Sequence, residues 1–262
     1  MKRGNIYLPI FSALKTIFPC SYDTPVLIYH AISNNKDIPG AIPFKIFKWH
    51  MDFFKQNQYE VVSLKRIGEM QIEKDKPERH CHLLCLTFDD GYEDFLNSAW
   101  SVLKDYNFPV ALFLIVKQIG QKGYLSLAQI KEMLSSGLIT IGSHTMEHRY
   151  LLELNSEQLN YEIKESKRIL EDSLGCSIDF FSYPWGGFSH RIQEIVKEAG
   201  YKAAFTTNQL LSRRRREKDN YCLKRMTMSR EDSFWRFLVK VSGFGYCFSR
   251  KIKIKDQGIN IT

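Results

Sequence analysis

The sequence predicts an α/β protein, a deformed (β/α) barrel with seven to eight parallel strands in a single domain. Strand-like and helix-like patterns alternate through almost the whole chain, which is typical of parallel βα units. Apolar runs such as 110–116 lack polar alternation, as expected for parallel strands covered on both faces. A doubly wound open sheet is the alternative, although no G-x-G-x-x-G motif follows an early strand.

The first half of the chain contains four predicted strands, each followed by a helical pattern. Phe47, Met51 and Phe54, for example, recur at helical spacing and would form one buried helix face. The strands are expected at 25–30, 59–64, 83–88 and 110–116, and the helices at 44–56, at 65–73, around Leu96–Leu103 before Pro109, and after a Ser126 cap.

The second half repeats this order. Asn155 or Ser156 is expected to cap a long helix whose apolar positions continue to Leu174. Strands are expected at 138–142, 179–183, 202–207 and 222–227, and further helices around Ile192–Ala199 and at 231–242.

Charge is unevenly distributed along the 262 residues, which carry a net charge of +8. We expect an N-terminal extension at 1–22, the barrel at 23–245 and a basic tail at 246–262. The basic runs Arg213–Arg216 and Arg250–Lys255 could favour acidic glycans, phospholipid or nucleic acid. A solvated loop and tail explain the same runs, so we expect no nucleic-acid partner.

The compartment is indicated by few features. No apolar stretch approaches the roughly 20 residues that a bilayer span requires. Lys2 and Arg3 precede a short apolar run that resembles a signal peptide, but Lys15 interrupts it and no cleavage site follows. We therefore expect a cytoplasmic protein, or one peripheral at the cytoplasmic membrane through its basic C-terminal region, with secretion as the open alternative.

Polar side chains follow several of the predicted strands. His30 ends the first strand, Asp89 and Asp90 follow the third, and His144 and His148 follow the fifth. The carboxyl ends of the strands share one face of a (β/α) barrel, where the active site forms. Residues this far apart in the sequence therefore gather only through the fold, and we expect them to form one site.

The residue types at this face indicate a metal site. Two adjacent carboxylates at the end of a buried strand are unfavourable unless a cation or a proton shares the site. His144 and His148 are four residues apart, so one helical turn would point both rings at one ion. Neighbouring strand residues point in opposite directions, so Asp89 and Asp90 are expected to have different roles. Two histidines and one aspartate leave metal positions open for water and substrate.

Three short motifs follow predicted strands: Thr87-Phe88-Asp89-Asp90-Gly91, His144-Thr145-Met146-Glu147-His148 and Tyr183-Pro184-Trp185-Gly186. Together they resemble the motifs of the polysaccharide deacetylases, carbohydrate esterase family four. The resemblance extends from about Pro25 to Thr227 and implies a deformed (β/α) barrel.

The resemblance also implies a role for each motif residue. Asp89 matches the general base that activates water, and Asp90, His144 and His148 match the ligands of one divalent metal, usually zinc, with cobalt or nickel as alternatives. The backbone N–H of Trp185 matches the donor that stabilises the tetrahedral oxyanion. A protonated group must then deliver a proton to the leaving amine.

Two departures from the family pattern concern the arginine of the third motif and the general acid. Ser182 and Tyr183 occupy the stretch where the arginine is usual, and no histidine follows His190 to supply the late acid motif. The arrangement is similar to that of the poly-N-acetylglucosamine deacetylases with a circularly permuted acid motif, which implies that His30 is the general acid. We hypothesise that Arg225 replaces the missing arginine and orients Asp89, a surface arginine being the alternative.

The function expected from these residues is metal-dependent removal of N-acetyl groups from the amino sugars of a polysaccharide or glycan precursor. The expected substrate-binding residues flank the motifs: Tyr29, Tyr92, Tyr183, Pro184 and Gly186. The basic C-terminal region raises a first alternative, deacylation of a lipid-linked sugar at the membrane surface. The two departures raise a second, a catalytically inactive relative that only binds carbohydrate.

Overall fold

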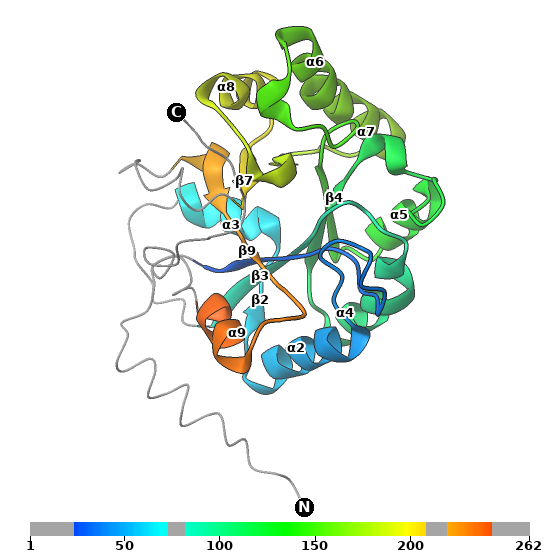
Figure 1. Ribbon diagram of the computed structural model, residues 1–262, viewed down its shortest axis with the longest axis vertical. Helices are drawn as coiled ribbons and strands as arrows, with labels where there is room; N and C mark the ends of the chain where they lie inside the picture. The colour runs from blue at the N-terminus through cyan, green and yellow to red at the C-terminus, as the bar shows by residue number, and fades with distance from the viewer. Residues whose placement is uncertain (1–23, 73–81, 208–218, 243–262) are drawn as a thin grey trace, which may run out of the picture.

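The computed structural model describes residues 24–72, 82–207 and 219–242. In this part of the chain, nine strands form one sheet, and each pairs with its neighbours in parallel. Figure 1 shows helices arranged around the outside of the sheet. The predicted N-terminal extension, the run Arg213–Arg216 and the basic tail lie outside the described residues.

The strands are short and close to their predicted positions. Strand β3 (Leu83–Phe88) has the predicted bounds, and the others differ from prediction mostly at their ends. They are β1 (Val26–Tyr29), β2 (Glu60–Val61), β4 (Val110–Leu114), β5 (Ile139–Ser143), β6 (Phe180–Ser182), β7 (Ala203–Thr206), β8 (Leu223–Lys224) and β9 (Met226–Thr227).

The helices alternate with these strands. The predicted helix 44–56 is α2 (Phe44–Gln56), and two helical runs contain π-helical turns, η1 (Phe95–Ala99) and η4 (Tyr161–Glu165). The others are α3 (Leu64–Ile72), α4 (Trp100–Tyr106), α5 (Leu127–Leu134), α6 (Ser156–Asn160), α7 (Ser166–Leu174), α8 (His190–Glu198), α9 (Phe234–Val241) and the 3₁₀ turns η2 (Val116–Gln118), η3 (Leu151–Glu153), η5 (Pro184–Gly186) and η7 (Asn220–Cys222).

Both predicted helix caps are present. The Ser126 hydroxyl accepts from the backbone N–H of Gln129, whose side chain bonds back to Ser126 N–H. Asn155 and Gln158 form the same reciprocal pair at the start of α6. These capping boxes satisfy backbone donors that would otherwise lack partners, and they place both helices where the sequence predicts.

One segment near the end of the chain brings the two edges of the sheet together and nearly closes it into a barrel. β8 pairs with β7, and β9 pairs with β1, although only Arg225 separates β8 from β9. The Arg225 backbone N–H donates to Thr206 O at 3.0 Å. The predicted strand 222–227 is therefore two short strands on two neighbours. Between these ends the order is β1-β3-β4-β5-β6-β7, with β2 beside β3 off this path. The order never reverses direction as a doubly wound sheet requires, which excludes that alternative.

The core has two parts because alternate residues of each strand face opposite sides. Ala111 and Phe113 of β4 belong to an inner cluster that fills the barrel, whereas Val110 and Leu112 belong to the cluster under the outer helices. Leu64 and Ile67 of α3 pack in the inner cluster with the first residues of β1, β6 and β7. Helix α3 therefore closes the amino-terminal end of the barrel.

Helix α9 packs against the barrel with its apolar side inward. Phe237, Leu238 and Val241 are buried, and the Phe237 ring stacks on His50 of α2 at 4.5 Å between centroids. Trp235 on the other side is 60% exposed. In the described part of the chain, no helix has the length and apolar content needed to span a membrane.

Candidate functional site

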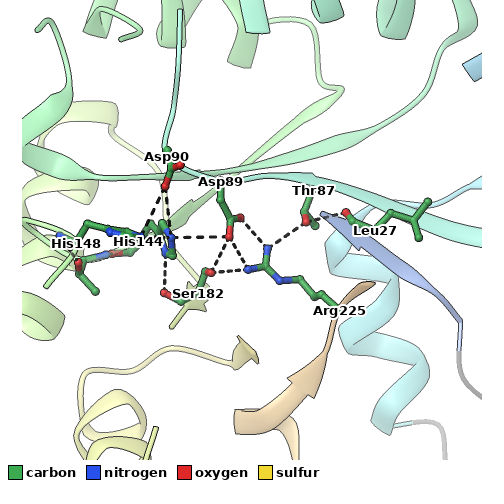
Figure 2. Close-up of polar contacts among 10 residues, drawn as sticks. Leu27, Thr87, Asp89, Asp90, His144, His148, Ser182 and Arg225 are labelled. Carbon is green, nitrogen blue, oxygen red and sulfur yellow. Dashed lines mark hydrogen bonds and ion pairs between the residues drawn. The ribbon is translucent and has the colours of Figure 1, made fainter. Parts of the chain in front are cut away.

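The predicted metal ligands converge at the carboxyl ends of β3 and β5 (Figure 2). Asp90 Oδ1 lies 3.7 Å from His144 Nε2 and 3.8 Å from His148 Nε2, and the two Nε2 atoms are 3.1 Å apart. One ligand atom from each of the three residues lies within 4.8 Å of the others. One ion could therefore contact all three residues.

The imidazoles are arranged as metal ligands require. His144 Nδ1 lies 2.8 Å from the carbonyl oxygen of Ser182, so Nδ1 is the protonated donor and Nε2 keeps its lone pair. Burial and the nearby His144 lower the pKa of His148 to about 4, although Asp90 opposes this shift. Neutral nitrogens and one carboxylate oxygen suit zinc, and they also suit cobalt or nickel.

The two histidines do not share a helical turn as predicted. They lie on a loop after β5, and Thr145 and His148 have φ values of +69° and +62°. The left-handed region is unfavourable for residues with a side chain, and each such residue costs on the order of 1–3 kcal/mol. The rings converge because the loop is held in this conformation.

A buried carboxylate holds the histidine loop from outside the barrel. Glu162 Oε2 accepts the backbone N–H groups of Met146 and Glu147 at 3.0 and 2.9 Å. These two residues stand between the left-handed Thr145 and His148. Glu162 is not among the residues predicted from the sequence for this site. Its position on the same helix face as the apolar Leu159 was the available signal.

Asp89 forms a buried ion pair with Arg225 (Figure 2). Arg225 Nη1 donates to Asp89 Oδ1 and Nη2 donates to Asp89 Oδ2, both at 2.7 Å. Nη1 also donates to Thr87 Oγ1 at 3.1 Å and Nη2 to Ser182 Oγ at 2.5 Å. Arg225 is 1% exposed, so the alternative of a surface arginine is wrong.

Thr87 and Ser182 are partners of this ion pair that were not predicted from the sequence. Besides its bond to the guanidinium, the Thr87 hydroxyl donates to Leu27 O at 2.9 Å, and Ser182 Oγ donates to Asp89 Oδ2 at 3.2 Å. Small hydroxyl residues in the apolar runs before the motifs were the available signal.

The charge of Asp89 is set by opposing effects. Burial disfavours the carboxylate, but the ion pair with Arg225 and the proximity of His144 outweigh it and hold the pKa of Asp89 well below its usual range. Asp89 Oδ2 is 3.8 Å from His144 Nε2, so the carboxylate lies between the arginine and the metal-ligand set. Asp89 is therefore an anion in a fixed orientation.

His30 and Trp185 lie near this centre on other strand ends. The charge of protonated His30 is a small contribution to the lowered pKa of Asp89 and to the lowered pKa of His148, so His30 lies near both side chains. Its Nδ1 is buried and has no hydrogen-bond partner among the described residues. The Trp185 ring centroid is 5.4 Å from that of His148, and the side chain is 70% exposed with a φ of +57°.

Two predicted substrate contacts are corrected by the structure. Tyr29 is fully buried under α2, and its hydroxyl is 3.1 Å from His50 Nδ1. Tyr183 is 1% exposed, and its hydroxyl donates to Tyr221 O at 2.9 Å. Both side chains point into the core because alternate strand residues face opposite sides, so neither can contact a substrate.

The other three predicted substrate contacts lie around the centre. Tyr92 is partly exposed, and its ring stacks on Tyr124 at 5.1 Å. Burial and the Asp90 carboxylate raise the pKa of Tyr92, so its hydroxyl stays protonated. Pro184 and Gly186 are buried, and the Gly186 carbonyl accepts from Thr206 Oγ1 at 2.7 Å. Pro184 and Gly186 shape the turn that presents Trp185.

Comparison with known proteins identifies the family. Residues 76–204 match the polysaccharide deacetylase family. YxkH of Bacillus subtilis, assigned by name to the polysaccharide deacetylases, is 33% identical over 78% of this chain and 71% of its own length. This chain belongs to the polysaccharide deacetylase family. The enzymes of this family are hydrolases that act on carbon–nitrogen bonds other than peptide bonds.

More distant relatives agree with this deacetylase assignment. The poly-β-1,6-N-acetyl-D-glucosamine N-deacetylase of Staphylococcus epidermidis is 25% identical over 81% of this chain and 76% of its own length. The Streptococcus pyogenes deacetylase PplD has the same fold, with a TM-score of 0.72 at 24% identity, covering 83% of this chain and 97% of PplD. The predicted barrel and the predicted family are both confirmed.

Proposed function

We propose that this deacetylase uses one divalent metal ion, most favourably zinc, to remove N-acetyl groups from the amino sugars of a glycan. One observation carries the proposal. The atoms of Asp90, His144 and His148 that can ligate a metal lie within 4.8 Å of one another, beside an ionised Asp89 that Arg225 holds by both oxygens. A bound ion would act as a Lewis acid that polarises the acetyl carbonyl and the attacking water.

Asp89 is the proposed general base. Its carboxylate accepts the proton of the attacking water, and Arg225 keeps it ionised and in one orientation. A carboxylate with a lowered pKa is a weaker base, so the ion pair reduces basicity while it fixes geometry. Positioning can compensate, because a well-oriented group gains a large effective molarity.

His30 and the Trp185 backbone complete the proposed reaction. His30 in its protonated form would deliver a proton to the sugar nitrogen as the carbon–nitrogen bond breaks, which releases acetate and the free amine. The backbone N–H of Trp185 would donate to the oxygen that becomes negative during attack.

The proposed substrate is a polymer containing N-acetylglucosamine. The staphylococcal relative acts by name on poly-β-1,6-N-acetyl-D-glucosamine. The exposed ring of Trp185 next to His148 offers a flat apolar surface on which a sugar ring could stack. A lipid-linked amino sugar would present the same N-acetyl group, so it is a second substrate to test.

The first test measures bound metal. Purified protein is reconstituted with zinc, cobalt or nickel, and the wild type is compared with the double variant His144→Ala/His148→Ala. His190→Ala is the matched control, since His190 lies on α8 and is exposed. We expect near one equivalent of metal in the wild type and the control, and loss of it in the double variant.

The second test separates catalysis from sugar binding alone. Asp89→Asn should retain the metal but lose roughly 10²–10⁴-fold in acetate release from N-acetylglucosamine oligomers. An Asp89→Asn protein as active as wild type would refute the proposed base. Wild-type binding of sugar without any acetate release would favour the non-catalytic alternative. Release from lipid-linked but not free oligomers would favour the lipid-linked substrate.

A further inference from the structure

We infer that Glu162 is a positioning residue for the metal site: its buried carboxylate sets the conformation of the loop that carries His144 and His148. The inference rests on the proposed metal site. Glu162 itself is 0% exposed, and it lies in the helical run of η4 and is not one of the three candidate ligands.

The first observation is where Glu162 attaches to the loop. It accepts the N–H groups of Met146 and Glu147, the two residues between left-handed Thr145 and His148. These N–H groups cannot pair with the sheet, since β5 has already ended at Ser143. Without Glu162 the middle of the loop would lose the acceptor that both N–H groups share.

The second observation is the helix that carries Glu162. The run from α6 to α7 contains the π-helical turn η4, and Glu162 is in it. A π-helical turn inserts an extra residue and changes the face on which the following side chains lie, and such turns are frequent at functional sites. Leu159 and Ile163 are buried in the core beside it, so Glu162 occupies a buried position next to apolar residues.

The third observation is that the loop depends on several anchors that all act on the same four residues. Thr145 N–H donates to Ser143 Oγ, and His148 N–H donates to Thr145 Oγ1. These bonds are local.

From other elements, η2 donates to the loop carbonyls, with Val116 N–H to Thr145 O at 3.1 Å and Lys117 N–H to Met146 O at 3.0 Å. Glu162 accepts the loop N–H groups that these contacts leave without an acceptor. The other oxygen of Glu162, Oε1, is buried and has no hydrogen-bond partner among the described residues. The hydrogen bonds that this carboxylate makes therefore go to the backbone of the loop.

The test compares zinc affinity and stability in variants of Glu162. Glu162→Leu removes the acceptor at similar size, and Glu162→Asp shortens the side chain by about one carbon–carbon bond, ~1.5 Å. Glu162→Gln keeps one oxygen that can accept. The matched control is Glu171→Leu, because Glu171 on α7 accepts the backbone N–H of Ile178 before β6.

Zinc dissociation constants are measured by competition with a chromophoric chelator, and the melting temperature of each metal-free protein is recorded separately. We expect Glu162→Leu and Glu162→Asp to weaken zinc binding roughly 10- to 100-fold, as losses of residues that support metal ligands do. Glu162→Gln should stay within a few fold of wild type, and Glu171→Leu should bind zinc as wild type does.

The outcomes are distinguishable. If Glu162→Leu and Glu162→Asp melt lower but bind zinc like wild type, Glu162 is structural only and the inference is wrong. If Glu162→Leu does not fold, Glu162→Asp decides the matter alone. A wild-type protein that binds no zinc, cobalt or nickel would instead overturn the proposed function, and this inference with it.

Discussion

Asp89 and Arg225 are oppositely charged residues buried in the same barrel, and each requires the other. Bringing two charges out of water is unfavourable, and a buried ion pair recovers that loss only with good geometry. Here both carboxylate oxygens are bonded to the guanidinium, and the guanidinium carbon lies 4.8 Å from the centroid of the Phe113 ring. The pair therefore meets the geometric condition under which a buried ion pair recovers the cost of desolvation.

Removing the arginine should be strongly destabilising. Arg225→Met leaves the Asp89 carboxylate buried without its counter-ion, and we expect a loss of about 3–5 kcal/mol in the free energy of unfolding. Urea denaturation measures it. Asp89→Asn/Arg225→Met should be more stable than Arg225→Met alone, because no unpaired charge is then buried. An Arg225→Met protein as stable as wild type would mean that water reaches Asp89.

The amino-acid types at the site could be predicted, but their individual directions could not. His30, Asp89, Asp90 and the two histidines were recognisable because polar residues directly follow apolar strands. Tyr29 was mistaken for a substrate contact because it neighbours His30. On a strand, a shift of one residue moves a side chain to the opposite face.

At the scale of elements, β4 and β5 pack closely because Gly142 of β5, opposite Phe113 of β4, has no side chain. A Cβ atom on Gly142 of β5 would lie 2.5 Å from the Phe113 ring and 3.0 Å from Phe180 O. Phe113 in turn packs under the Arg225 guanidinium. Gly142 therefore leaves space for the Phe113 ring of the inner cluster, which contacts the guanidinium of the ion pair.

A pair of glycine substitutions tests this packing. Gly142→Ala should destabilise the protein by about 1–3 kcal/mol, since the aromatic ring must move inside a filled barrel. Gly68→Ala in α3 meets only Phe180 Cε1 at 3.9 Å and should stabilise by about 0.5–1 kcal/mol through helix propensity. Thermal unfolding of both variants measures the difference. If Gly142→Ala and Gly68→Ala had equal melting temperatures, the Phe113 ring would be able to move aside without loss of stability.

Element positions were largely predictable, whereas loop conformations were not. Apolar runs and capping residues located the strands and helices, because both follow from local pattern. The histidine loop was expected to be a helical turn, but Glu162 holds it with two left-handed residues. That contact joins segments 15 and 16 residues apart, so no local pattern reveals it.

At the scale of the whole molecule, acid should weaken the fold through His50. His50 on α2 is buried between Tyr29 of β1 and Phe237 of α9. Burial, with a smaller contribution from Lys240, lowers the pKa of His50 to about 3. The unfolded chain takes up this proton near pH 6.5, so stability falls as the pH drops from there toward 3.

The difference between wild type and His50→Gln isolates this effect. Glutamine can still accept from the Tyr29 hydroxyl but does not titrate. We expect wild type to lose roughly 2 kcal/mol relative to His50→Gln between pH 7 and pH 5. Urea denaturation at the two pH values measures it. Parallel losses in both proteins would assign the acid sensitivity to other groups.

Under the proposed mechanism, the position of Arg225 in the sequence also limits when a growing chain can become active. A chain grows from its N-terminus, and Arg225 is added 136 residues after Asp89. Until then β1 and β7 lack the neighbours that β9 and β8 provide, and Asp89 lacks its guanidinium. The same short segment thus completes the strand pairing of the barrel and supplies the counter-ion of the proposed base. A nascent or truncated chain that ends before residue 225 lacks β9 and the Arg225 guanidinium, so under the proposed mechanism activity would report a completed barrel.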